Sequence, residues 1–150
     1  MTIRRGILIA AVAVVTATQW GCASLEKPFE PVPSVPQDKA LVYIYRQPSF
    51  IGGGVYYTVN AGKQPLRKLY NGGYFPFVAD PGEVELWAET ESRSSVTLDL
   101  KPGETKYVKG TVGIGFIVGR PTLSVVDAAV GAVEIKECKL VPEEKAAAPK

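Results

Sequence analysis

Apolar and polar residues alternate strictly through the middle of the chain. Between residues 83 and 91, the even positions are Val, Leu, Ala and Thr, while the odd positions carry four glutamates and Trp87. Val96, Leu98 and Leu100 continue the apolar series after a Ser-Arg-Ser turn. A period of two is typical of strands that bury one face in a core and expose the other. The pattern therefore predicts two strands joined by a turn, with their apolar faces inward.

Turn residues recur every few positions along the rest of the chain, which is typical of an all-β sandwich built from short strands. The strongest short hairpin signal is Asn71–Gly72, which we expect to join the strands on either side. The segment 107–118 is interrupted by glycines and becomes apolar on both faces, so we expect a central or covered strand there. The other strand candidates span residues 41–45, 55–59, 66–70, 74–78 and 122–126.

One segment near the C-terminal end has helical spacing. Asp127 is a favourable N-cap residue, and Ala128, Ala132 and Ile135 would share one face of a helix that ends near residue 138. Gly131 lowers the helical propensity of this segment. We expect a short helix after the last long strand.

The first 24 residues have the order of a secretory signal. Two arginines precede an apolar run over residues 6–20, and small residues then flank Cys22. This boundary resembles the lipobox of bacterial lipoproteins, which implies that the thiol of Cys22 receives a diacylglycerol and becomes the mature N-terminus. The run is shorter than the roughly 20 residues of a membrane-spanning helix. A spanning anchor and a secreted product cut near Ala23 are the alternatives.

Composition divides the remaining chain into a linker, a domain and a tail. Four prolines between residues 28 and 36 predict an extended, disordered tether. The charged, Ala-rich end predicts a frayed tail. The residues between them suffice for one domain with its own core. The predicted division is a signal peptide over 1–21, lipidated Cys22 and linker over 22–37, a sandwich domain over 38–141 and a tail over 142–150.

Composition also limits the chemistry of this chain. It contains no histidine, which removes the usual general base and the commonest metal ligand. The two arginines of residues 1–21 account for the whole formal charge of +2, so the mature chain lacks the basic surplus that nucleic acid requires. Alternate glutamates on a strand stand about 7 Å apart, too far for neighbours to hold one ion. We expect no catalysis, no cofactor, no metal site and no nucleic-acid partner. We expect Cys138 to be a small buried residue, with a redox or intermolecular-disulfide role as the alternative.

Four apolar or aromatic residues are candidates for contacts with a partner. Trp87 shares the outward row with the glutamates, which favours a partner or glycan surface, unless the ring lies against another strand or the helix. Tyr56 belongs to an aromatic-rich first half, whose rings fit either core packing or saccharide stacking. Phe50 and Ile51 precede three glycines. They predict a flexible loop with an apolar tip for contact with a partner or the bilayer.

Six segments of the domain carry a resemblance to a known family. They are residues 40–46 (ALVYIYR), 60–63 (NAGK), 71–75 (NGGYF), 81–83 (PGE), 88–91 (AETE) and 115–121 (GFIVGRP). Together they resemble a bacterial lipoprotein family known as domain of unknown function 2846. The resemblance implies an immunoglobulin-like or transthyretin-like sandwich on a lipid-anchored envelope protein, and it implies no activity.

The predicted fold is all-β: a single antiparallel sandwich with a short C-terminal helix, preceded by a signal-peptide helix and a Pro-rich tether. The predicted location is the bacterial cell envelope, at the outer membrane facing the periplasm. We expect a lipid-anchored module that makes non-catalytic contact with an unidentified envelope protein or polysaccharide. The alternative is a periplasmic module that binds a small ligand or glycan.

Overall fold

The computed structural model describes residues 25 and 27–143. The predictions for the signal peptide, for Cys22 and for residues 144–150 lie outside the described residues. The strands are β1 (Ala40–Tyr45), β2 (Tyr57–Ala61), β3 (Gln64–Leu69), β4 (Gly73–Ala79), β5 (Gly82–Glu89), β6 (Arg93–Leu100), β7 (Thr105–Gly113), β8 (Arg120–Val126) and β9 (Lys139–Leu140). Between β8 and β9 lie α1 (Ala128–Glu134) and a single 3-10 turn (Ile135–Glu137).

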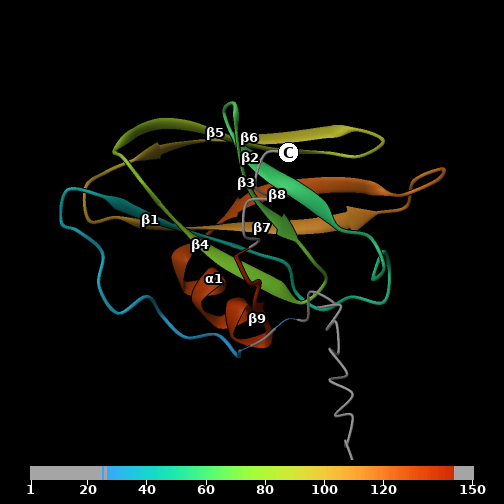
Figure 1. Cartoon of the computed structure of the whole chain (residues 1–150), viewed down its shortest axis with the longest axis horizontal. Helices are drawn as coiled ribbons and strands as arrows, with labels where there is room; N and C mark the ends of the chain where they lie inside the picture. The colour runs from blue at the N-terminus through green and yellow to red at the C-terminus, as the bar shows by residue number, and fades with distance from the viewer. Residues whose placement is uncertain (1–24, 26, 144–150) are drawn as a thin grey trace, which may run out of the picture.

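These strands form two sheets that pack face to face (Figure 1). One sheet has the order β8-β7-β1-β4-β9, and the other has the order β3-β2-β5-β6. Most neighbouring strands are antiparallel, whereas β1 runs parallel to β7 and β4 runs parallel to β9. The predicted all-β sandwich with a short C-terminal helix is confirmed.

The alternation in β5 and β6 places their apolar faces in the core between the sheets. Leu86 and Ala88 of β5 are fully buried, and Leu98 and Leu100 of β6 are also buried. Glu85, on the opposite face, is exposed. The prediction of two strands with one buried face is confirmed.

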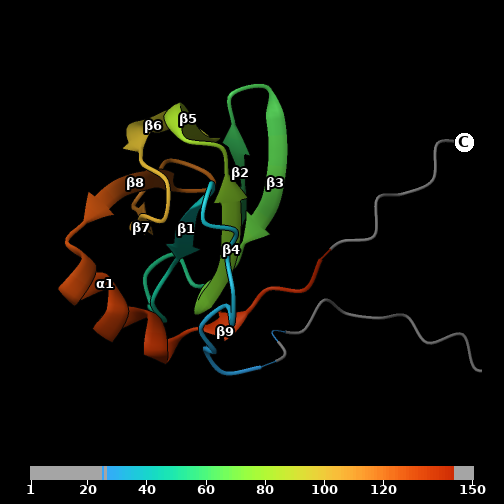
Figure 2. The same ribbon diagram turned by 90° about the vertical axis from the view of Figure 1, so that its left-hand side faces the viewer.

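Strand β1 differs because all six of its residues are buried. Val42 and Ile44 point into the core between the sheets, while Leu41, Tyr43 and Tyr45 belong to a second apolar cluster on the outer side of the sheet. Two segments cover this outer face: α1 with its 3-10 turn, and the N-terminal segment over residues 28–36 (Figure 2). The sandwich therefore has a third, partial layer.

The described part of the predicted tether belongs to this third layer. The ring of Phe29 packs edge-to-face on Tyr43 and Tyr74, with centroid distances of 5.4 Å and 5.1 Å. The backbone N–H of Val32 donates to the hydroxyl of Tyr43 at 2.8 Å, and that of Glu30 donates to Tyr74 at 3.2 Å. The prediction of a free tether is wrong for these residues. The apolar residues between the prolines cover tyrosines that water would otherwise reach.

The Asn71–Gly72 turn forms, but it does not close a hairpin. Gly72 has a φ of 70°, as a tight turn requires. The strands on either side, however, belong to different sheets, because β3 pairs with β2 and β4 pairs with β1. The hairpin prediction is wrong, since the turn signal is local whereas pairing depends on which neighbouring strand completes each buried face.

The segment 107–118 also differs from its prediction. Strand β7 ends at Gly113, and the rest of the segment lies in the exposed loop between β7 and β8. Up to Gly113 the expectation of a covered strand holds, because β7 lies between β1 and β8. The apolar residues beyond it are exposed.

The helix begins where the sequence predicts. The carboxylate of Asp127 accepts a hydrogen bond from the N–H of Ala129 at 2.8 Å. Ala128 is exposed, contrary to its predicted place on the inward face, whereas Ile135 is fully buried. Gly131 is buried directly against Tyr107 of β7, so this glycine allows the helix to approach the sheet. No helix of the described ranges has the length and apolar character to cross a bilayer.

Replacement of Gly131 by alanine tests this close approach. At an exposed helical position, Gly→Ala stabilises by about 1 kcal/mol. Here the new Cβ would overlap the ring of Tyr107, so we expect a loss of about 2 kcal/mol in the free energy of unfolding. Urea denaturation measures the change. The control Val133→Ala alters an exposed position of the same helix and should change the free energy by no more than about 0.5 kcal/mol. A Gly131→Ala variant as stable as the parent would show that the contact is not tight.

Candidate functional site

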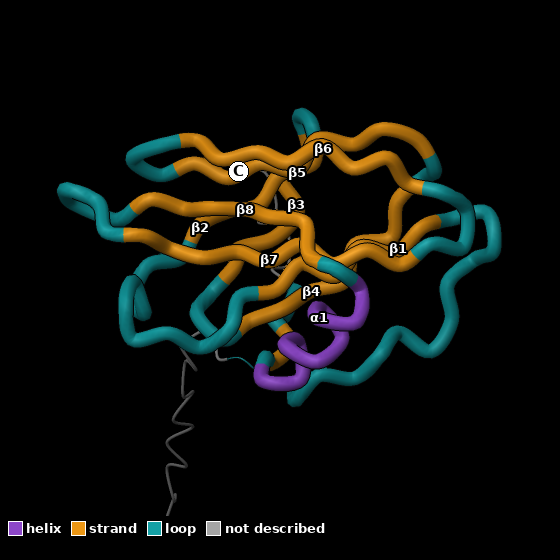
Figure 3. The backbone as a smooth tube through the Cα atoms, turned by 180° about the vertical axis from the view of Figure 1, so that it is seen from behind, coloured by secondary structure: helices purple, strands orange, loops and turns teal. Residues whose placement is uncertain are grey.

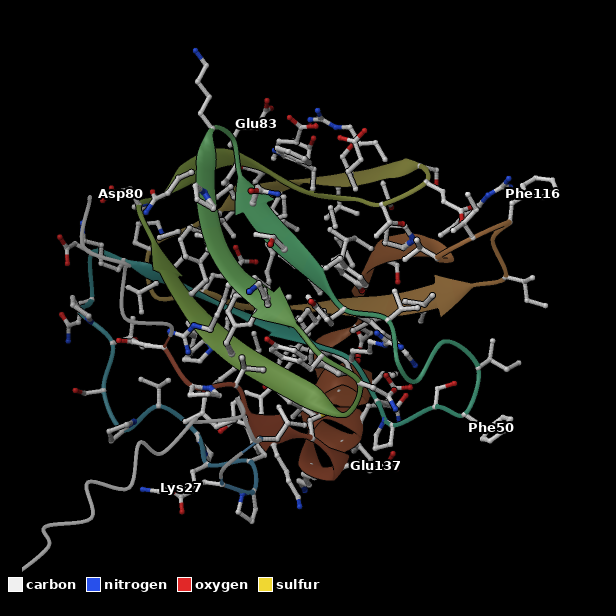
Figure 4. All side chains as sticks on the ribbon, turned by 45° about the vertical axis from the view of Figure 1, so that its right-hand side comes forward. Lys27, Phe50, Asp80, Glu83, Phe116 and Glu137 are labelled. Carbon is white, nitrogen blue, oxygen red and sulfur yellow. The ribbon has the colours of Figure 1, made fainter. Side chains whose placement is uncertain are left out.

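Three connections gather at one end of the sandwich (Figure 3). They join β1 to β2 over residues 46–56, β5 to β6 over 90–92, and β7 to β8 over 114–119. Phe50 is 102% exposed, and Phe116 and Ile117 are each 91% exposed. Figure 4 shows Phe50 and Phe116 projecting from this side of the molecule. We call the exposed apolar side chains of the first and third connections the apolar loop end: Phe50, Ile51, Ile114, Phe116, Ile117 and Val118.

Val112 of β7 lies between the two loops that form the apolar loop end. Gly52 from one loop and Gly119 from the other both approach the side chain of Val112 closely. A Cβ added to Gly52 would lie 2.7 Å from Val112 Cγ1, and one added to Gly119 would lie 2.8 Å from the same atom. Both glycines have positive φ, 68° and 105°, which side chains rarely adopt. The loops are therefore packed on a common residue of the sheet.

The loop over residues 46–56 is held by a buried cation. The guanidinium of Arg46, which is 1% exposed, donates to the carbonyl oxygens of Val55 and Gly52, each at 2.6 Å. Burial lowers the pKa of Arg46 from its ordinary value. The side-chain amide of Asn71 also pairs with both backbone groups of Ser49, at 2.9 Å and 3.0 Å. These bonds fix the chain on both sides of Phe50 and Ile51.

The loop over residues 114–119 is held by Glu91 in the turn between β5 and β6. The Glu91 carboxylate accepts hydrogen bonds from the backbone N–H groups of Phe116 at 2.7 Å and Gly119 at 3.3 Å, and from those of Ile117 and Val118. The bonds from Val118, Ile117 and Phe116 lower the pKa of Glu91 to about 2. Nearby, the Thr90 hydroxyl donates to the carbonyl oxygen of Gly119 at 2.6 Å. One carboxylate thus pairs four amides of an exposed turn.

Glu91 is an exception in the row of glutamates that the sequence places on a solvated face. The other members, Glu83, Glu85 and Glu89, are exposed on the outer side of β5. Within residues 25 and 27–143, no three metal-ligating side chains of the His, Cys, Asp or Glu type are grouped. The row is mainly an exposed strand face, and its last member holds a loop.

The structure separates the predicted contact residues. Phe50 and Ile51 belong to the apolar loop end. Tyr56 is 53% exposed at the end of the same loop, where its ring lies against Tyr70 with a centroid distance of 5.2 Å. Trp87 lies on the outer face of the four-stranded sheet, so it points outward as its row predicts.

Trp87 already makes two contacts on that outer face. The guanidinium carbon of Arg93 lies over the ring, 4.2 Å from its centroid. The indole N–H donates to the carbonyl oxygen of Gly62 at 2.7 Å. Part of the ring and its polar atom are therefore engaged within the chain.

Cys138 is the buried residue that the sequence predicts. Its side chain is 1% exposed, and its Sγ lies 3.4 Å from the carbonyl oxygen of Arg46. Burial raises the pKa of the thiol to about 12, so the reactive thiolate is absent at neutral pH.

Sequence reasoning missed four residues of the apolar loop end, because it extended a strand through Ile114, Phe116, Ile117 and Val118. Two signals could have shortened that strand. It would have had twelve residues, about twice the usual length of a strand. Glycines at positions 113, 115 and 119 also frame the apolar residues, as expected for a turn rather than a strand.

No family model matches the chain, and no curated protein matches it. A solved structure with some similarity is the N-terminal domain of AlgF from P. aeruginosa, with 20% sequence identity and a TM-score of 0.40. The similarity covers 63% of this chain and 100% of that chain. The resemblance to domain of unknown function 2846 stays a prediction.

Protonation of Glu91 should release the loop that it holds. The folded-state pKa of about 2 is below the ordinary value of 4.5, so the carboxylate stabilises the loop above pH 4.5 and loses this effect as the pH falls toward 2. We expect the amide NMR signals of residues 116–119 to shift together with a midpoint near pH 2. The shift should disappear in Glu91→Gln and persist in the control Glu89→Gln. A midpoint near 4.5 would show that the carboxylate does not pair these amides in solution.

Proposed function

We propose that this chain is a lipid-anchored, non-catalytic contact module of the bacterial cell envelope. It meets a neighbouring component of the envelope through the apolar loop end. The single observation that carries the proposal is this group of large apolar side chains in solvent, on loops whose backbones are already fixed. Contiguous exposed apolar residues on a soluble domain are typical of interaction sites.

The fixed loops favour a role in contact. Ordering a flexible loop on binding costs conformational entropy, whereas a preorganised loop avoids much of that cost. Arg46, from the buried base of the first loop, and Glu91, from the neighbouring turn, supply this order. The loops therefore combine exposure of their side chains with restriction of their backbones.

The alternative of a glycan-binding module has less support. Saccharide stacking needs an open aromatic face with polar groups around it. Trp87 is partly covered by Arg93, and its indole N–H is bonded to Gly62. Tyr56 also precedes the start of β2, whereas Trp87 lies opposite Asn60 near the other end of that strand, so their rings are about 13 Å apart along the sheet. We therefore prefer contact through the apolar loop end.

Incorporation of labelled palmitate tests the anchor. We expect the wild-type chain to be labelled in bacterial cells and Cys22→Ala to be unlabelled. The control Cys138→Ala removes the buried cysteine and should keep the full label, because its thiol is 1% exposed and acylation requires access. Equal labelling of wild type and Cys22→Ala would overturn the proposed anchor.

A photoreactive side chain in intact cells tests the contact surface. Placed at position 116, it should give a covalent adduct with a neighbouring molecule. Placed at position 63, in the turn between β2 and β3 at the opposite end of β2, it should give much less. Both positions are exposed, so the comparison controls for reactivity. Equal yields at the two positions would contradict a contact role for the apolar loop end.

A further inference from the structure

We infer that the neighbour of the apolar loop end is the lipid bilayer itself. The loops enter the interfacial region of the membrane that carries the chain and hold the domain against it in one orientation. This inference rests on the proposed anchor at Cys22 and goes beyond it, because a lipid on the linker alone would leave the orientation of the domain open.

The composition of the loop end suits a membrane interface. No charged residue lies within residues 47–56 or 112–119. The large exposed side chains are aromatic and aliphatic, the types that lie at the boundary between headgroups and acyl chains. The two ionised groups nearest the tips are already paired, since buried Arg46 donates to two carbonyl oxygens and the Glu91 carboxylate accepts four backbone N–H groups.

The backbone of the loop end suits the same environment. An unpaired N–H or C=O is costly wherever water is scarce. Here the Glu91 carboxylate pairs the N–H groups of residues 116–119, and Arg46 pairs the carbonyl oxygens of Gly52 and Val55. These contacts lower the cost of removing the turns from water, and they come from residues outside the exposed tips.

The described residue nearest in sequence to the proposed anchor lies close to one of the two loops. The side chain of Leu25 lies against the backbone of Gly73. A Cβ added to that glycine would stand 3.3 Å from Leu25 Cδ2. Gly73 follows the turn whose Asn71 holds Ser49, the residue before Phe50. Cys22 precedes Leu25 by three residues, a reach of about 10 Å. The linker thus leaves the domain beside one of the two loops.

The shape of the loop end favours a bilayer over a protein partner. The tips of Phe50 and Phe116 project separately from two loops (Figure 4), and the depression between the loops is shallow and open. Separate projecting side chains can enter a fluid interface without a matching surface. Arg120, an exposed residue whose guanidinium lies over the Phe116 ring at 5.6 Å from its centroid, would meet anionic headgroups at the same depth.

Fluorescence quenching by brominated acyl chains tests the inference. The full chain, produced in bacterial cells, is reconstituted into vesicles of phosphatidylethanolamine and phosphatidylglycerol, with and without bromine on the lipid tails. The reporters are Phe116→Trp and, as the control on the far turn, Lys63→Trp. Each is compared with the parent chain, which subtracts the signal of the native tryptophans. We expect the bromolipid to remove roughly half of the fluorescence added at position 116 and almost none of that added at position 63.

The outcomes separate the bilayer contact from the anchor. Absence of quenching at position 116 in a chain that is acylated and floats with the vesicles would overturn the inference and leave the anchor in place. If the full chain from bacterial cells carries no acyl group at Cys22 and is still quenched at position 116, the bilayer contact is supported and the anchor is overturned. A photoadduct to a protein from position 116 in cells, without bromolipid quenching, would overturn the bilayer as the occupant.

Discussion

Both faces of β1 are removed from water, and the rest of the molecule is arranged around this constraint. Its inner residues complete the core between the sheets, while Tyr43 and Tyr45 on the outer face need a second cover. A tyrosine ring gains from burial only if its hydroxyl keeps a partner. Tyr43 accepts the N–H of Val32, and Tyr45 donates to Glu134 of α1 at 2.5 Å. The N-terminal segment and the helix are thus held by the same strand.

The apolar loop end depends on a similar division of roles. The side chains that meet solvent lie at the tips of the loops, whereas the groups that fix those loops lie outside the tips: Arg46 directly after β1, Glu91 in the turn after β5, and Asn71 before β4. This arrangement leaves the exposed residues free to serve a contact. Because these groups come from distant parts of the chain, the shape of the contact surface depends on the folding of the whole sandwich.

Much of the fold could be predicted because its signals are local. The alternation in β5 and β6, the Asp127 cap and the burial of Cys138 depend on residues close together in the chain, and all three are confirmed. The site was predicted only in part. The sequence predicts an exposed tip at Phe50 and Ile51, whereas it predicts a strand in place of the second loop because apolar residues usually indicate burial.

The sequence by itself determined where most of the strands lie, where the short helix begins and which chemistry is absent, since histidine-based catalysis needs a residue that the chain lacks. Only the tertiary structure decided that the strands on either side of the Asn71–Gly72 turn belong to different sheets. It also decided that the proline-containing segment from Phe29 to Val35 covers the outer face of β1, and that Glu91 pairs with amides 25 to 28 residues away. The physical reason is that a local pattern states whether a residue prefers burial or a turn. Its actual neighbours follow from how two sheets share one core.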